Sequence, residues 1–176
     1  MGRSHPVDMS RRRRHYQSLI LAAGLLAWPA SVAMTADCGP KPASIEGFTR
    51  AVDGDTLIDI DGGRQLRLWG IDAPELRGGD IGAALRAREH LDRLVRDSHL
   101  YCAVLEQDAW CRLVVVCFRN TAPEDIAVAM LTDGHAWVMR RYAWQNLRTA
   151  LLAAAYEAAE EAAKRDRRGI WSRLKD

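Results

Sequence analysis

The feature that most constrains the fold is a series of short strand-like runs divided by turn residues. Three of them, around residues 47–52, 56–60 and 65–71, combine β-branched, aromatic and other apolar residues at short intervals. The Asp-Gly-Gly sequence at 61–63 is typical of a hairpin turn between the second and the third. Two more runs follow at 100–105 and 112–118, the last nearly all apolar, as in a buried strand. We therefore predict five strands.

Three further segments have the 3.6-residue period of helices. In 81–95, one face is formed by Ala84, Leu91, Leu94 and Val95. A short helix is predicted within 121–134, with Pro123 near its start, and a longer one within 148–169, with Gly169 as its stop. Five strands and three helices in this order predict an α+β domain with an antiparallel β-barrel.

The first 33 residues differ from the rest of the chain. Four arginines precede an apolar run that starts at Leu19, and Pro29, Ser31 and Ala33 follow it. This order is typical of a secretory signal peptide, which we assign to residues 1–33. A retained membrane anchor is the alternative, because the run approaches the roughly 18 residues that span a bilayer. We expect a periplasmic or secreted protein with a linker at 34–45 and a folded domain at 46–174.

The charge balance changes once this segment is set apart. The whole chain has a formal net charge of +2, but residues 1–33 alone carry five arginines and one aspartate, so the remainder carries −2. Proteins that bind nucleic acid passively depend on a basic surface to neutralise phosphates. The composition of the folded part argues against such a binder.

All four cysteines follow the predicted signal: Cys38, Cys102, Cys111 and Cys117. An even count in an exported chain indicates disulfides, with three connectivities allowed. Cys102 and Cys117 flank a predicted strand–turn–strand whose register places them opposite each other, so we favour that pair, which leaves the other two as a weaker prediction. A zinc site that uses His99 or His135 is the alternative, although no CxxC or HxxxH spacing supports it.

Acidic residues gather in the first three strands. Residues 52–75, VDGDTLIDIDGGRQLRLWGIDAPE, contain six carboxylates and two arginines. Asp55 and Asp72 sit at strand ends, where either alone is explained as a turn residue. If both lie at the same edge of a sheet, two carboxylates come within reach of one cation. Two carboxylates, a carbonyl and waters suit a hard ion such as Ca²⁺.

Arg67 interrupts an apolar strand between these acids. It has the same strand parity as Trp69 and Ile71, so it either extends to solvent at the barrel end or is aimed into a site. A guanidinium fork binds two phosphate oxygens and strengthens as charge grows in a transition state. Glu75, one residue after a proline, is a candidate to accept the proton of an attacking water. Together these residues predict a metal-assisted phosphodiester site.

The chain resembles the staphylococcal nuclease (thermonuclease) family. The resemblance rests on VDGDTL…RLWGIDAPE, followed in order by DAWCR, DGHAW…RRY and GIW, and it covers about residues 45–173. It implies a five-stranded OB-type barrel with three helices. It also implies a Ca²⁺-dependent nuclease that acts on DNA and RNA, cleaves the 5′ P–O bond and leaves 3′-phosphates.

The resemblance also implies roles for individual positions. Those matching the metal site are Asp55, Asp72 and Ala73, the last through its main-chain carbonyl. Those matching the catalytic groups are Arg67 and Arg112, the phosphate-clamping arginines, and Glu75, the general base. Those matching the substrate pocket are Tyr142, Arg140 in place of a second tyrosine, and Trp110.

One departure from the family pattern bears on Arg112. The motif before this arginine is typically Tyr-Gly-Arg, whereas here it is Trp110-Cys111-Arg112. If the turn needs a positive φ, losing the glycine costs on the order of 1 kcal/mol. We expect a monomeric nuclease. The alternatives are a non-catalytic OB-type module that binds nucleic acid or a protein partner, and an enzyme gated by the redox state of Cys111.

Overall fold

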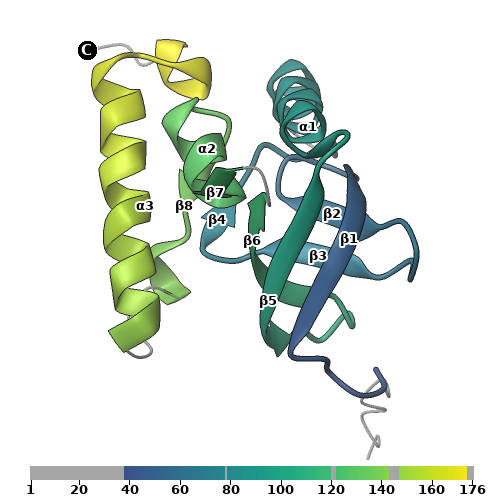
Figure 1. The fold of residues 1–176 in the computed structure, drawn as a ribbon. Helices are drawn as coiled ribbons and strands as arrows, with labels where there is room; N and C mark the ends of the chain where they lie inside the picture. The colour runs from purple at the N-terminus through teal and green to yellow at the C-terminus, as the bar shows by residue number, and fades with distance from the viewer. Residues whose placement is uncertain (1–37, 78, 120–121, 143–146, 174–176) are drawn as a thin grey trace, which may run out of the picture. The chain divides into compact units, whose positions relative to one another are not determined.

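A computed structural model describes residues 38–77, 79–119, 122–142 and 147–173. The predicted signal peptide lies outside them. Five of the strands form a closed barrel (Figure 1). They are β1 (Ser44–Ala51), β2 (Thr56–Asp59), β3 (Gln65–Leu68), β5 (His99–Gln107) and β6 (Leu113–Arg119). The predicted α+β fold with a five-stranded barrel is thus confirmed.

One pairing in the barrel is parallel. Neighbours in the order β3-β2-β1-β5-β6 pair antiparallel, and the barrel closes through a parallel pairing of β3 with β6. When five strands alternate in direction, the first and the last point the same way, so their pairing is parallel. The barrel is therefore mixed, with antiparallel pairing everywhere except at its closure.

Both disulfides favoured by the sequence are present. Cys102 and Cys117 are direct partners in the β5–β6 register, and their sulfur atoms are 2.03 Å apart. Cys38 and Cys111 form the second bridge across 73 residues of chain. With every cysteine in a disulfide, the zinc alternative has no thiolate ligand. Disulfides of this kind are typical of an extracellular or otherwise oxidising compartment.

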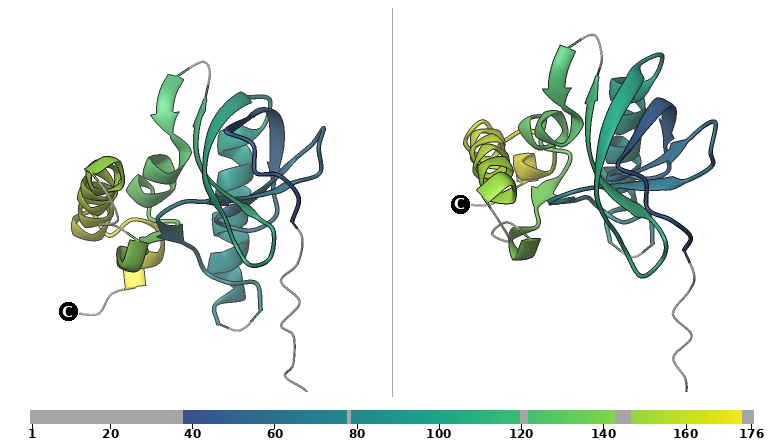
Figure 2. Two further views of the ribbon diagram at one scale, coloured as in Figure 1. Left: turned by 90° about the horizontal axis from the view of Figure 1, so that it is seen from below. Right: turned by 60° about the horizontal axis from the view of Figure 1, so that its bottom comes forward.

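The first helix has the predicted bounds. Helix α1 (Ile81–Val95) buries the apolar side of its surface, and the side chain of Asp80 caps it by accepting from the Ala83 N–H at 3.0 Å. Figures 1 and 2 show α1 against one face of the barrel, beside β1, whereas α2 and α3 lie together beside β6 and β7.

The second helix starts later than predicted. Residues near Pro123 belong to strand β7 (Ala122–Asp125), and α2 (Ile126–Thr132) begins only after Asp125. The Asp125 carboxylate accepts from the Ala127 N–H at 2.8 Å, so this aspartate, not the proline, sets the start of the helix. A proline is tolerated in a short strand at the sheet edge.

The third helix supports the wall of the site. Helix α3 (Leu147–Arg165) carries Tyr156, which is fully buried, packs against Trp69 and donates a 2.6 Å hydrogen bond to Asp125. The helix ends before Gly169, which instead opens the 3₁₀ helix η2 (Gly169–Arg173). No helix among the described residues is long and apolar enough to span a membrane.

Candidate functional site

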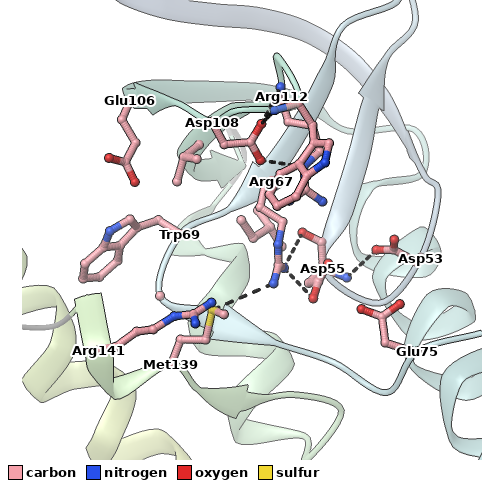
Figure 3. Close-up of a pocket in the computed structure, with 14 residues that line it drawn as sticks. Asp53, Asp55, Arg67, Trp69, Glu75, Glu106, Asp108, Arg112, Met139 and Arg141 are labelled. Carbon is pink, nitrogen blue, oxygen red and sulfur yellow. Dashed lines mark hydrogen bonds and ion pairs between the residues drawn. The ribbon is translucent and has the colours of Figure 1, made fainter. Parts of the chain in front are cut away.

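A cleft of about 310 Å³ opens at one end of the barrel (Figure 3). Its walls come from the β1–β2 loop, strand β3, the β5–β6 turn and the segment after β8 (Trp137–Val138). Its charged and aromatic lining consists of Asp53, Asp55, Arg67, Trp69, Glu75, Glu106, Asp108, Trp110, Arg112 and Arg141. The cleft thus brings together the predicted groups Asp55, Arg67, Glu75, Trp110 and Arg112.

Asp55 is fixed by a tightly packed loop. A side chain at Gly54 would meet the Cβ atoms of Ala73 at 2.6 Å and Ala87 at 2.8 Å, so only glycine lets the loop approach so closely. Asp55 is buried, at 5% exposed. Its carboxylate accepts hydrogen bonds from the Ala73 N–H at 3.1 Å and from the Thr56 hydroxyl at 3.0 Å. The VDGDT sequence therefore holds Asp55 against the segment that carries Asp72 and Ala73.

Arg67 lies between the two predicted metal carboxylates. The β2–β3 register places it opposite Thr56, directly beside Asp55. Its Nη1 forms an ion pair with Asp55, and its Nη2 lies 3.0 Å from Asp72 Oδ1. Strand β4 (Ile71–Asp72) presents Asp72 by pairing with β8, where Asp72 is opposite Trp137. One guanidinium thus touches both carboxylates.

The residues present fit a hard divalent cation. Burial raises the pKa of Asp55 well above its usual range, and the Arg67 guanidinium only partly opposes that effect. The contact with Arg67 therefore does not fully compensate the negative charge of the Asp55 carboxylate. The cleft lining as a whole also has an excess of negative charge, with five carboxylates against three guanidinium groups. Within the described ranges, no group of three or more His, Cys, Asp or Glu side chains is placed to hold a metal. A sparse oxygen set of two carboxylates suits Ca²⁺, which completes its coordination with carbonyls and waters.

Arg112 is held by the turn between β5 and β6. The Asp108 carboxylate accepts hydrogen bonds from three groups: the Trp110 N–H at 3.0 Å, the Arg112 N–H at 2.9 Å and the Arg112 Nε at 2.8 Å. Burial disfavours the charged form of Asp108, but these bonds outweigh it and leave the pKa lowered. One carboxylate therefore shapes the turn and orients the guanidinium that it carries.

Cys111 occupies the position where the family pattern has glycine, and its φ is +64°. The turn does need the left-handed conformation, so the expected cost of about 1 kcal/mol applies. The Cys38–Cys111 disulfide ties this residue to the start of the domain. Gln107 Nε2 donates to the carbonyls of both cysteines at 3.4 Å. The bridge compensates for the missing glycine by holding the strained residue in place.

Glu75 and Trp110 are the most accessible of the predicted residues in the cleft. Glu75 is exposed and lines the cleft with Asp53 and Asp55 (Figure 3). Trp110 is 78% exposed, and the Arg112 guanidinium carbon lies 5.5 Å from its ring centroid. An exposed aromatic ring beside an arginine is a suitable platform for a base or a sugar.

One predicted substrate residue, Arg140, is not brought into the cleft. Arg140 points to α3, where it pairs with Glu160, a residue only 1% exposed that also accepts from the Val138 N–H at 2.8 Å. Arg140 thus compensates a buried carboxylate, and its neighbour Arg141 lines the cleft instead. Tyr142 belongs to η1 (Arg140–Tyr142), and its side chain lies outside the described residues.

Several lining residues were missed by the sequence reasoning. They are Asp53, Glu106, Asp108, Met139 and Arg141. Asp108 had a usable signal, because it opens the DAWCR motif four residues before Arg112. Trp69 is buried, at 4% exposed, and it also forms part of the cleft wall.

The histidines considered for zinc have other neighbours. His99 packs edge-on against Phe48 with ring centroids 5.6 Å apart, and His135 stacks on His90 at 4.2 Å. Burial, followed by the charge of His90, lowers the pKa of His135 to about 4. Both rings therefore act as packing groups between elements.

Comparison with known proteins agrees with the motifs. The family model described as staphylococcal nuclease homologue matches residues 65–173, which is more than half of the chain. The matched segment contains Arg67, Asp72, Glu75 and Arg112, and Asp55 precedes it. A search among curated proteins finds no match. The chain therefore belongs to the staphylococcal nuclease homologue family, and this membership implies a nuclease-like function on nucleic acid.

Proposed function

We propose that this protein is an exported, Ca²⁺-dependent nuclease that hydrolyses the phosphodiester bonds of DNA, RNA or both and leaves 3′-phosphates. The observation that carries the proposal is the convergence of Arg67 and Arg112 on one cleft with Asp55 and Glu75. The two arginines come from a barrel strand and from a turn that is distant from it in the sequence.

Each group has a part in the proposed reaction. Arg67 and Arg112 donate to the non-bridging oxygens of the scissile phosphate, and their hydrogen bonds strengthen as charge builds on those oxygens. Glu75 accepts the proton of the attacking water. Asp55, Asp72 and the carbonyl of Ala73 would hold the cation, which would supply Lewis acidity and orient the water. The P–O5′ bond breaks, the leaving 5′-oxygen takes up a proton from solvent water to become a hydroxyl, and the phosphate stays on the 3′ side.

Arg67 changes partners in this proposal. Its guanidinium is paired with Asp55 and Asp72, the same carboxylates that would hold the cation. If Asp55 and Asp72 held a divalent ion, the fork of Arg67 would be available to the phosphate. The metal and the arginine thus depend on each other through a shared pair of acids, and substrate clamping is coupled to metal binding.

Export is supported by two independent features. The four cysteines form two disulfides, which persist in oxidising compartments. Residues 1–33 have the order of a secretory signal, although they lie outside the described residues. We place the mature domain in the periplasm or outside the cell, acting as a monomer.

The proposal is tested by digestion of plasmid DNA and of RNA with the mature domain in Ca²⁺ and in chelator. We expect cleavage only with the metal, and product ends that a phosphatase must treat before a polymerase can extend them. Glu75→Gln should slow cleavage while Ca²⁺ affinity, measured by calorimetry, is retained. Equal cleavage in chelator, or none in either condition, contradicts the proposal.

The non-catalytic binding module gives a different result in the same assay. It predicts tight binding of an oligonucleotide without turnover, with affinity unchanged by Glu75→Gln. This alternative was suggested mainly by Cys111, which replaces the glycine of the family pattern directly before Arg112 and so puts the placement of Arg112 in question. Because Arg112 lines the cleft in spite of that departure, the motive is weakened.

A further inference from the structure

We propose that a second groove, on the α1 side of the barrel, binds the phosphate backbone of the polynucleotide outside the cleft. The groove has a volume of about 520 Å³ and lies between β1 and α1. It is lined by four arginines and two acids: Arg50, Arg88, Arg93, Arg96, Glu89 and Asp92. This inference rests on the proposed function, since the groove would hold the same substrate.

The acids do not cancel the arginines. Asp92 is used locally: its Oδ1 accepts from the Ala51 N–H at 3.4 Å, and its Oδ2 is paired with Arg96. No ion pair involves Arg50 or Arg88 among the described residues, and both side chains are exposed. Neither guanidinium forms an ion pair among the described residues, although the charge of Arg88 also favours the anionic form of Asp92, whose pKa is lowered chiefly by the Arg96 hydrogen bond.

The dipole of helix α1 explains the positions of only two of the four arginines in the groove. Arg93 and Arg96 lie at the C-terminal end of α1, where positive charge is favoured by the helix dipole. Arg88 lies in the middle of α1, and Arg50 lies on strand β1, so neither is explained in this way. Leu85, 42% exposed, adds an apolar contact on the same wall, which suits the sugar of a nucleotide.

The groove adjoins the cleft through a single loop. Ala51 lines the groove, and Asp53, two residues later, lines the cleft. Two residues of chain span at most about 7 Å, so the linings of the two sites approach each other at this loop. The loop that presents Asp55 thus also borders the groove.

The charges of the two sites explain why a second one is useful. The cleft lining has two more carboxylates than guanidinium groups, so it offers little attraction to a polyanion outside the metal and the scissile phosphate. The groove has two more guanidinium groups than carboxylates. Phosphate affinity that depends on arginine falls with rising salt, because binding releases counterions. The groove thus supplies the non-specific grip that the cleft lacks.

The test compares Arg50→Gln and Arg88→Gln with Arg165→Gln, which removes the same charge from an exposed position on α3. We expect KM for a long duplex to rise severalfold in the two groove variants, with kcat unchanged. The slope of log KM against log salt should fall by about 0.9 per arginine for duplex DNA. For a dinucleotide substrate, and for Arg165→Gln on either substrate, both constants should match those of the wild type.

Two results overturn the groove. One is an unchanged KM and salt slope on long DNA in both variants. The other is an equal rise of KM on the dinucleotide, which points to a disturbed cleft. If the wild-type protein cleaves neither substrate, the proposed function fails, and the groove is judged by equilibrium binding of a 20-mer. Lowered salt slopes for Arg50→Gln and Arg88→Gln then support the groove on its own, and unchanged slopes reject it.

Discussion

The two arginines of the cleft do the same proposed work but are positioned in opposite ways. Arg67 stands on a strand whose neighbours on both sides belong to the barrel, and its side chain, 12% exposed, is enclosed by two carboxylates. Arg112 stands at the end of a turn, with a side chain 27% exposed, and depends on one carboxylate and a disulfide. The barrel positions the first arginine through its register, whereas the second needs a covalent tie because the turn is strained.

The largest effects should come from removing either arginine. Arg67→Ala and Arg112→Ala should each lower kcat/KM by about 10²–10³-fold, as for other preorganised donors of positive charge. The Lys variants should recover little, because an ammonium lacks the planar fork. Initial rates on a defined oligonucleotide measure the change. A loss of less than tenfold in either Ala variant would remove that arginine from the catalytic account.

Arg67→Ala and Arg112→Ala should also differ in their free energy of unfolding. Arg67→Ala leaves the buried Asp55 without its partner, a change that typically costs about 3–5 kcal/mol. Arg112→Ala removes a half-exposed pair with Asp108, worth about 1 kcal/mol at most. Denaturant unfolding in chelator measures both. Equal destabilisation would show that the two arginines are not held as differently as their surroundings indicate.

The next largest effect concerns the disulfide at Cys111. Opening the bridge in Cys38→Ser/Cys111→Ser should cost about 2–4 kcal/mol of stability and leave a side chain at positive φ. Cys38→Ser/Cys111→Gly also lacks the bridge, but its glycine adopts that φ freely and should regain about 1 kcal/mol. Activity should follow the same order, because the turn carries Arg112. Denaturant unfolding and initial rates measure the two effects.

The control is the other bridge. Cys102→Ser/Cys117→Ser breaks a buried disulfide within the barrel, remote from the turn. At a temperature where it stays folded, it should lower stability but not kcat. Ca²⁺ affinity should be unchanged in all three double variants, because the Asp55 and Asp72 side remains intact. Equal activity of the Ser and Gly variants at position 111 would show that the bridge does not position Arg112.

A smaller effect is expected from Asp108→Asn. The amide oxygen can still accept from the Trp110 and Arg112 N–H groups, but the charge-assisted bond to Arg112 Nε is lost. We expect kcat to fall about tenfold, equivalent to about 1.4 kcal/mol of barrier, with Ca²⁺ affinity unchanged. A parallel loss of Ca²⁺ affinity would indicate that the two sides of the cleft are not independent.

The sequence predicted the Arg67 side better than the Arg112 side, for a physical reason. Asp55 directly precedes β2, whose register places Thr56 opposite Arg67, and Asp72 follows Arg67 by only five residues, so all three are close in the chain or in one hairpin. The start of α2 was placed too early because Pro123 is a common first residue of helices, whereas the cap is Asp125. The cleft face of residues 140–142 was also not predictable. Which of the tandem arginines turns inward depends on Glu160, a buried acid of α3 that is distant in the sequence.

The smallest expected effect is the pH dependence that Asp108 contributes on the Arg112 side. Hydrogen bonds from Arg112 and the turn outweigh burial and lower the folded-state pKa of Asp108 below its usual value of 3.8. A carboxylate with a depressed folded pKa contributes stability above its unfolded pKa, and the contribution is lost as the pH falls through the folded pKa. The gap in melting temperature between wild type and Asp108→Asn should therefore be constant from pH 7 to about 5 and close below about pH 4. The same comparison can be made in the Arg112→Ala background, which lacks the main hydrogen-bond donor to Asp108. There, Asp108→Asn should change the melting temperature by less between pH 7 and about 5. If the gap instead narrows near neutral pH, Asp108 is not held as an anion by the turn, and the contrast with the barrel side loses its electrostatic basis.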